Sequence, residues 1–537
     1  MFLARLLVLF SLVCISCAHS SFEQKQLKHA LDFATSNRLE LEILLQHYTY
    51  DSLKLEAAKF LIRNMPHCYS YQQGGEMDSV KRVRTYYSPF GQIDQTYARR
   101  WGHYTYRNLL KIYDAHIITA EYLIDNIDRA FDNWQKRPWN RSLSFEDFCE
   151  YLLPYRIGDE PLEERRELYE KKYGYLLDSI YKGGDVVEAA NLVSRHLQEP
   201  VFIYCEDFEL PHIGPRYLFS HRYGSCVDAA DIVTYAFRAV GIPCMEDTDA
   251  RGGHVWNVVR DTTGRDVPIW YIASEAVRGS RDTGGYKRGK VYRPMYGFQE
   301  EKAAHLGDDW KSMPLLFYHP YMKDVSYAYY PDTLRILTGI PDDEVCYLAH
   351  FHEAHWWSCA CARSASGKME IPNLESELVY LPMKYTKGNY YSSGFPFWFA
   401  GGEINTFLPD WEKTVKVRLY RKYPVYGWLR SFMGHVVGGT FEGSMTKNFE
   451  DGKTLYEIAD TPVIARNRIF LNKSVKCRYI RYKADNDKCA ELAEMTFYAN
   501  GKAVSPIAVW GSLRKKEICM CWQSTWRMVI LFLIICL

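Results

Sequence analysis

The chain carries almost no net charge, because 66 Lys and Arg residues balance 65 Asp and Glu residues among its 537. Since nucleic-acid-binding surfaces need a basic excess, the sequence predicts no nucleic-acid partner. Internal repeats and a long linker are also lacking, and the 15 Cys show no spacing that imposes a disulfide framework. Apolar residues make up 47% and charged residues 24%, which excludes a mostly disordered chain.

Long hydrophobic runs are absent from the interior and occur only at the two ends. After a short basic start, Leu6–Val13 is apolar and too short to span a membrane, as in a secretory signal. Ser16 directly before Cys17 resembles the lipobox of bacterial lipoproteins, in which Cys17 carries the lipid. Residues 1–17 therefore predict an exported chain that a lipid anchors to the membrane of the cell envelope. The alternative is plain signal cleavage near Ala18, which discards Cys17.

The apolar run at the other end, Met528–Leu537, has ten residues, about half of what a membrane-spanning helix needs. It is interpreted either as a buried strand or as the stub of an altered reading frame. We therefore treat 513–537 as an uncertain tail with no membrane role.

The interior divides into a helical part and a β part. Residues 22–200 are predicted to be helical: Leu53–Ile62 has apolar positions at helix spacing, and Ser144 is a helix cap before acidic residues, with Pro154 ending that helix. After about residue 324, short apolar runs between Gly, Pro and Asp turns predict strands. These runs are Val345–Ala349, Leu378–Pro382, Thr414–Tyr420 and Cys477–Tyr482.

Between these parts lies the segment that predicts chemistry. Cys226 precedes Val227–Val240, which has a helical pattern, and Gly241 and Pro243 are the stop signals of that helix. A thiol at the first turn of a helix gains from the unpaired N–H groups and the positive end of the dipole, which favour the thiolate. The same N–H groups can hold an oxyanion.

A β-hairpin is predicted directly after this helix. His254 begins an alternating run that ends at Arg260, Asp261–Gly264 is the turn, and a second alternating run ends at Tyr271. A Cys at a helix start and a His on an adjacent strand form the nucleophile–base pair of thiol acyl transfer.

At these residues the chain resembles the transglutaminase-like superfamily, which has the papain-like fold. The resemblance rests on Cys226 with its helix, on Arg238–Pro243 and on Gly253–Asn257 with the hairpin. It implies that Cys226 is the nucleophile and His254 the general base. Asn64–Pro66 and Tyr151–Arg156 further resemble large secreted transglutaminase-domain proteins of Bacteroidota.

The chain departs from this family at the third catalytic position. Family members usually place an Asp beside the His, but if residue 260 faces 265 then His254 faces Tyr271. Asp266 would then face Val259, about 17 Å away along the strand. Glu275 can fold back toward His254 and is our candidate for the third catalytic residue.

Two clusters resemble metal sites without matching them. His350–Cys361 lacks the spacing of a zincin helix, and an aromatic-rich strand is the favoured interpretation. Glu246–Asp249 lacks the glycine and the distal Glu of a calcium loop, so a solvated turn is favoured.

Near the C-terminus, Lys476–Tyr482 and Cys489–Tyr498 resemble the closing strands of discoidin-like (F5/8 type C) sandwich domains, many of which bind glycans.

The sequence thus predicts a multidomain α+β protein. The expected parts are a helical region at 22–200, a papain/transglutaminase-like core at 201–310, a β-sandwich at 324–425 and a discoidin-like β-sandwich at 430–512. The leading hypothesis is a cofactor-free, cysteine-dependent enzyme that acts on amide bonds of a peptide or protein as a peptidase, amidase or transglutaminase. The alternative is a weakly active or inactive surface lipoprotein whose β-domains contact glycan or peptide.

Overall fold

A computed structural model describes most of the chain in two compact units, one made of 1–351 and 356–408 and the other of 352–355 and 409–537. The described residues are 22–75, 77–79, 81–82, 106–199, 202–204, 210–251, 253–270, 275–281, 287–299, 313–337, 340–352, 355–416, 434, 436–462, 466–471, 476–485, 494–499, 502–512, 517–521 and 528–533. The fold mixes helices and sheets, as the sequence predicts. The signal segment, with Cys17, lies outside the described residues.

Helices predominate in the described part of 22–199, which confirms the predicted helix at Leu53–Ile62 and the cap at Ser144. Ser144 Oγ accepts a hydrogen bond from the Asp147 backbone N–H at 3.0 Å, and Asp51 caps the helix that begins at Ser52 in the same way. After a helix over 22–33, the helices are η1 (Thr35–Asn37), α2 (Arg38–His47), α3 (Ser52–Arg63), η2 (Met65–His67), η4 (Tyr106–Asn108), η5 (Asp114–His116), α6 (Ala120–Lys136), η6 (Pro138–Ser142), α7 (Phe145–Tyr151), α8 (Arg166–Tyr175), η7 (Leu176–Ile180) and α9 (Val186–Leu197). Strands β1 (Tyr69–Tyr71) and β2 (Lys111–Tyr113) form a small antiparallel pair among them.

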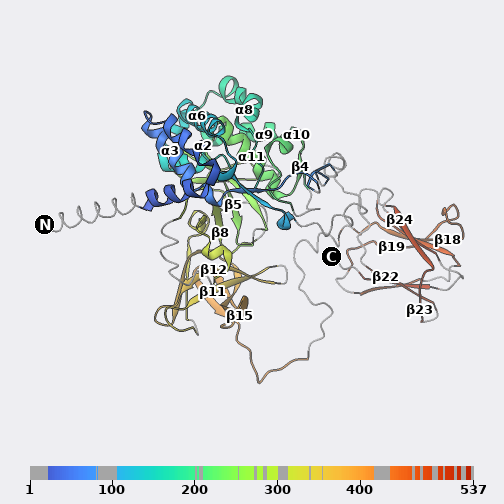
Figure 1. The fold of residues 1–537 in the computed structure, drawn as a ribbon. Helices are drawn as coiled ribbons and strands as arrows, with labels where there is room; N and C mark the ends of the chain where they lie inside the picture. Colours follow the sequence, from blue (N-terminus) through green and yellow to red (C-terminus); the bar gives the residue numbers. More distant parts are fainter. Residues whose placement is uncertain are drawn as a thin grey trace. The chain divides into compact units, whose positions relative to one another are not determined.

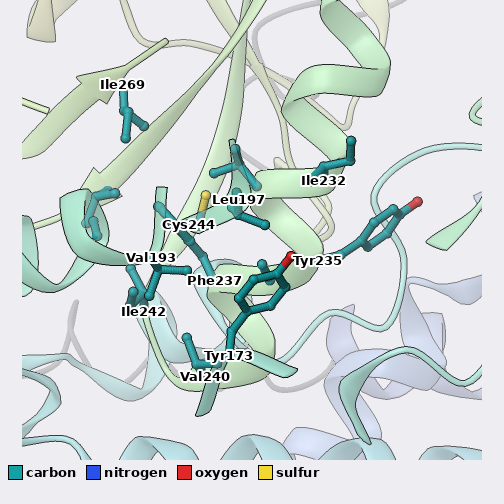
Figure 2. Close-up of a cluster of buried hydrophobic side chains, with 14 of the residues drawn as sticks. Tyr173, Val193, Leu197, Ile232, Tyr235, Phe237, Val240, Ile242, Cys244 and Ile269 are labelled. Carbon is teal, nitrogen blue, oxygen red and sulfur yellow. The ribbon is translucent and has the colours of Figure 1, made fainter. Parts of the chain in front are cut away.

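Helix α11 (Cys226–Val240) is the buried centre of this unit. Nearly every residue of α11 is buried, and Gly241 ends the helix in the left-handed region at φ 85°. Figure 2 shows Phe237 and Val240 of α11 among Tyr173 of α8 and Val193 and Leu197 of α9. This core is what holds the start of α11 in place. The short elements beside it are β3 (Ile203–Tyr204), α10 (Pro215–Ser220) and β4 (Tyr223–Gly224), whereas Phe317 of α13 (Leu315–Tyr318) packs in a different cluster with Tyr292 and Tyr347.

One face of α11 packs on a five-stranded antiparallel sheet with the order β7-β6-β5-β8-β9. Its strands are β5 (Cys244–Asp249), β6 (Val255–Arg260), β7 (Asp266–Ile269), β8 (Val291–Pro294) and β9 (Met322–Asp324). Because β9 ends at residue 324, the core sheet extends beyond the boundary predicted at 310. Figure 1 shows β5 and β8 between the helices and the later strands β11 (Val345–His352) and β12 (His355–Arg363).

The predicted hairpin is present as β6 and β7, but its register differs by one residue from the prediction. Arg260 pairs with Asp266 rather than with Arg265, and Asn257 pairs with Ile269. The turn residue Gly264 has φ 77°, and Asp261 pairs with Arg265 across a three-residue loop. The prediction that His254 faces Tyr271 is therefore wrong in register, since the observed pairing points to residue 272, and both 271 and 272 lie outside the described residues.

A second β layer completes this unit, in agreement with the strands predicted after residue 324. Its larger sheet has the order β12-β11-β14-β16-β17, with β15 on β14, and β10 pairs separately with β13. The strands are β10 (Asp332–Leu337), β11 (Val345–His352), β12 (His355–Arg363), β13 (Lys368–Leu374), β14 (Leu378–Thr386), β15 (Asn389–Ser392), β16 (Phe397–Ala400) and β17 (Glu403–Thr406). The strand predicted at Thr414–Tyr420 is wrong at 414–416, and its remainder lies outside the described residues.

The C-terminal unit contains two antiparallel sheets, β19-β18-β21-β25-β24 and β20-β26-β22-β23. The strands are β18 (Thr440–Ser444), β19 (Lys453–Glu457), β20 (Arg466–Phe470), β21 (Tyr479–Lys483), β22 (Glu494–Ala499), β23 (Lys502–Val504), β24 (Ala508–Ser512), β25 (Glu517–Cys521) and β26 (Met528–Leu533). Strands β25 and β26 lie inside these sheets, so the described part of 513–537, which the sequence left as an uncertain tail, is strand. Within the apolar run at the C-terminus, Met528–Leu533 is a strand whose backbone pairs with β20 and with β22.

None of the helices in the described ranges is both long and apolar enough to cross a membrane.

Candidate functional site

Cys226 is the first residue of α11, as the sequence predicts, and its position is set by a capping box. Ser225 Oγ accepts the backbone N–H of Val227 at 3.3 Å, and the Ser225 N–H donates to Asp228 Oδ2 at 2.8 Å. Cys226 is in no disulfide bond and is 5% exposed. The thiol therefore lies at the positive end of a buried 15-residue helix.

His254 lies one residue before β6 and is held by its backbone and by two indole rings. Its carbonyl accepts from Thr248 Oγ1 at 3.0 Å and from the Asp249 N–H at 3.3 Å. The imidazole centroid is 4.4 Å from the ring of Trp270 and 5.6 Å from that of Trp256. With 7% of its surface exposed, His254 is nearly enclosed.

Helix α11 and strand β6 bring these two residues to the same part of the core. Cys226 belongs to the buried cluster that includes Trp256 and Trp270, and these are the two rings that flank His254. The two rings that contact His254 thus belong to the same buried cluster as Cys226, although 28 residues separate Cys226 from His254 in the sequence.

The third candidate, Glu275, contacts a different element. Its carboxylate forms an ion pair with Arg195 at 2.6 Å, and the side chain is 54% exposed. The next residue is tied to the same helix α9, because the Ala276 N–H donates to Asn191 Oδ1 at 2.8 Å. These contacts direct Glu275 toward α9, and our mechanism gives it no role.

A buried ionic network that sequence reasoning missed supports the ring cluster. Arg293 Nη2 donates to Asp247 Oδ2 at 2.9 Å, and Arg293 Nη1 donates to Asp266 Oδ2 at 2.8 Å. Tyr329 connects this network to the rings, since its hydroxyl donates to Asp247 at 2.7 Å and accepts the indole N–H of Trp256 at 2.9 Å. Burial by itself would lower the pKa of Arg293, but the charges of Asp247 and Asp266 outweigh it and raise that pKa well above its usual value.

Asp247 belongs to the acidic run Glu246–Asp249, in which the sequence suggested a solvated turn. That interpretation is wrong, because the run is strand β5 and all four of its side chains are buried. Successive strand positions face opposite sides of a sheet, which explains why Asp247 meets Arg293 while Glu246 accepts a hydrogen bond from the Thr234 hydroxyl of α11 at 2.7 Å. Among the described residues, no group of three or more His, Cys, Asp or Glu side chains is placed to hold a metal ion.

A cavity of about 340 Å³ opens beside the predicted pair. Val227 and Val255, which directly follow Cys226 and His254, both line it, together with Met245 of β5. Its far wall comes from the helical region and includes His67 and Arg156. The cavity therefore borders the Cys226 cluster through side chains that are adjacent to the predicted catalytic residues.

A His–carboxylate pair also lies at the cavity, whose lining includes its histidine, His212. His212 Nδ1 is 2.9 Å from Asp231 Oδ1, and the Asp231 side chain is completely buried. Burial raises the pKa of Asp231. Burial alone would lower the pKa of His212, yet the charge of Asp231 raises it well above the usual value, which favours the imidazolium beside the buried carboxylate. Beside it, burial and the charge of Asp231 raise the pKa of Glu246 to about 8.

Comparison with known proteins gives no relative of this chain: no family model, no curated protein and no solved structure matches it.

Proposed function

We propose that the protein is a cysteine-dependent acyl-transfer enzyme of the transglutaminase-like class, which acts on amide bonds. The observation that carries this proposal is the placement of Cys226 at the capped start of α11, in the cluster whose indole rings flank His254. A helix start favours the thiolate and supplies free N–H groups, which are the two things that a thiol nucleophile needs.

In the proposed reaction, His254 takes the thiol proton and the Cys226 sulfur attacks the amide carbonyl carbon. The N–H groups at the start of α11 stabilise the oxyanion. The C–N bond then breaks, the imidazolium gives its proton to the leaving amine, and a thioester remains. Attack by water breaks the C–S bond and releases an acid, whereas attack by an amine forms a new amide, and either path restores the thiol–imidazole pair.

The proposal includes the compartment that the N-terminal segment predicts. Export and lipidation at Cys17 would place the enzyme at the cell envelope, where peptide or protein substrates meet it. The C-terminal sheets, which resemble discoidin-like sandwiches in sequence, would serve as contacts to glycan or other surfaces.

Alkylation of the intact protein tests the catalytic pair. With iodoacetamide near neutral pH, we expect Cys226 to be labelled faster than the other thiols, and His254→Ala to slow this labelling at least tenfold. His221→Ala is the matched control, because His221 bonds to the Tyr217 carbonyl and does not line the cavity or contact Trp270. Peptide mass spectrometry reads out each thiol.

A second candidate function is a binding protein whose transglutaminase-like core is a scaffold. The near-complete burial of Cys226 and His254 favours it, since an apolar enclosure suits a structural thiol as well. Equal and slow labelling of all thiols, unchanged in His254→Ala, would establish this candidate and contradict the enzyme.

A further inference from the structure

The turn between strands β5 and β6 carries His254, and β5 holds the backbone of that residue. Thr248 Oγ1 donates to the His254 carbonyl at 3.0 Å, and the Asp249 N–H donates to the same oxygen at 3.3 Å. The pairing of Thr248 with Val255 is the last in the ladder of these strands, so His254 lies where the turn meets the sheet. The direction of the His254 side chain therefore depends on the shape of this turn.

The Asp249 carboxylate fixes the shape of the turn from inside. Asp249 Oδ1 accepts the backbone N–H of Gly253 at 2.8 Å and that of Arg251 at 3.0 Å. Because Gly253 directly precedes His254, this bond restrains the chain before the His254 Cα, while the bonds to the His254 carbonyl restrain it after the Cα. The backbone of His254 is thus held on both sides.

The charge of Asp249 is balanced within the turn. Arg251 Nη2 is 3.2 Å from Asp249 Oδ2, and the two side chains are 11% and 0% exposed. Gly253 leaves room for this ion pair, since a Cβ at that position would lie 2.8 Å from Arg251 Nη2. The Arg251 guanidinium also lies over the indole of Trp357 in β12, 5.6 Å from the ring centroid. Loss of the carboxylate would therefore release both the turn and Arg251.

An equivalent set of contacts lies at the far end of β6. Asp261 Oδ1 accepts the backbone N–H groups of Thr263 and Arg265 at 2.9 and 3.0 Å. Asp261 Oδ2 is paired with Arg278 at 3.1 Å. Asp261 follows His254 by seven residues, which is about 23 Å along an extended strand. Both carboxylates shape a turn of the same sheet, but only that of Asp249 does so beside His254.

We propose that Asp249, together with Thr248, is a positioning residue that holds the His254 imidazole in place relative to the Cys226 thiol through the backbone of the turn. The inference rests on the proposed function, in which His254 is the general base. The positioning acid then lies five residues before the His, on β5, rather than on the second strand of the β6–β7 hairpin. Proton transfer needs groups placed within about 0.5 Å, and a misplacement of about 1 Å can slow a reaction about 100-fold.

Iodoacetamide labelling of the intact protein tests this role. We expect Asp249→Ala to slow the labelling of Cys226 at least about fivefold, and to raise the pH of half-maximal labelling rate toward about 8.5, as for an unassisted thiol. Asp261→Ala is the matched control, which should label Cys226 as the wild type does. Asp249→Asn keeps an oxygen acceptor for the N–H groups of the turn and should label Cys226 within about twofold of the wild type.

The other thiols distinguish a positioning role from a purely structural one. Cys68, Cys149 and Cys244 are buried, so a variant that loses its structure would label them faster. Faster labelling of these thiols together with Cys226 in Asp249→Ala would overturn the role of Asp249. Thr248→Val removes the hydroxyl at similar volume and should slow only Cys226, whereas Thr248→Ser keeps the hydroxyl and should restore the rate.

The labelling of His254→Ala separates failure of this inference from failure of the proposed function. Wild-type labelling of Cys226 in Asp249→Ala and Thr248→Val, beside slow labelling in His254→Ala, would overturn this inference alone. An equal loss of rate in Asp261→Ala and Asp249→Ala would also overturn it, because the stability of the turns would then set the rate. Equal labelling of Cys226 in the wild type and in His254→Ala would overturn the proposed function and this inference with it.

Discussion

At the residue scale, the guanidinium of Arg293 is almost fully buried and balances the charges of Asp247 and Asp266. A buried charge is costly unless it is paired, and removing one partner leaves the others uncompensated. Arg293 thus ties three strands together, since it belongs to β8 while Asp247 and Asp266 belong to β5 and β7.

We predict that Arg293→Met destabilises the first unit by about 3–5 kcal/mol, because two buried carboxylates lose their counter-charge. Arg335→Met is the matched control: its ion pair with Glu370 is exposed, and its loss should cost about 0–1 kcal/mol. Urea unfolding followed by tryptophan fluorescence measures both changes. Similar losses for the two variants would contradict the structural role given to Arg293.

The pH dependence of stability should reveal Glu246. The folded state keeps the Glu246 proton up to about pH 8, whereas the unfolded state loses it near 4.5, so between these values the folded state binds more protons. Stability of the wild type relative to Glu246→Gln should therefore fall as pH rises from about 4.5 to 8 and change little above that. If the free energy of unfolding changes with pH in the same way in both proteins across this range, Glu246 titrates normally.

At the element scale, two glycines with positive φ have different roles. Gly241 ends α11 at φ 85°, and a Cβ there would lie 2.7 Å from Arg137 Cγ, whereas Gly264 in the hairpin turn has φ 77° and open space around it. The first position combines backbone strain with crowding, and the second has strain only.

We predict that Gly241→Ala lowers the free energy of unfolding by more than Gly264→Ala, with the second change near 1 kcal/mol. Thermal unfolding of both variants measures the difference. A larger loss for Gly264→Ala would mean that the turn, rather than the end of α11, limits the stability of this region.

The hairpin also shows how far sequence patterns define an element. Alternation of apolar residues and the turn signal predict both strands correctly. The pairing depends instead on whether the chain closes the turn at Asp261 with Arg265, and a difference of one residue exchanges the faces of a strand. Local pattern carries no information on that choice, so the register of the hairpin was predicted wrongly by one residue.

At the scale of the whole molecule, β25 and β26 complete the sheets of the C-terminal unit. Strand β25 lies between β21 and β24, and β26 lies between β20 and β22, so both are interior strands. Loss of interior strands leaves long unpaired edges on the remaining strands.

We therefore predict that truncation after Ser512 prevents folding of the C-terminal unit, while the first unit stays folded. Limited proteolysis should degrade the chain beyond residue 409 and leave a stable fragment of the first unit. Truncation after Leu533 is the control, because it keeps both strands. Equal protease resistance of the two truncated proteins would show that β25 and β26 are dispensable.

Membrane attachment is also a property of the whole molecule. If Cys17 carries a lipid, Cys17→Ser should move the protein from the membrane fraction to the soluble fraction, because the acyl chains supply the binding energy. Fractionation with detection of the full-length chain measures this. Membrane association that is unchanged in Cys17→Ser would refute the lipobox hypothesis.

The sequence by itself determined the elements that local chemistry controls. The cap at Ser225, the apolar face of α11 and the stop at Gly241 place Cys226 at a helix start, because capping and helix periodicity act over a few residues. Only the tertiary structure decided which residues from other parts of the chain lie near the start of α11. The buried charges at Asp247 and Arg293, and the cavity with Glu246 and Asp159, join segments far apart in the chain, and packing of distant elements selects such contacts without leaving a local pattern.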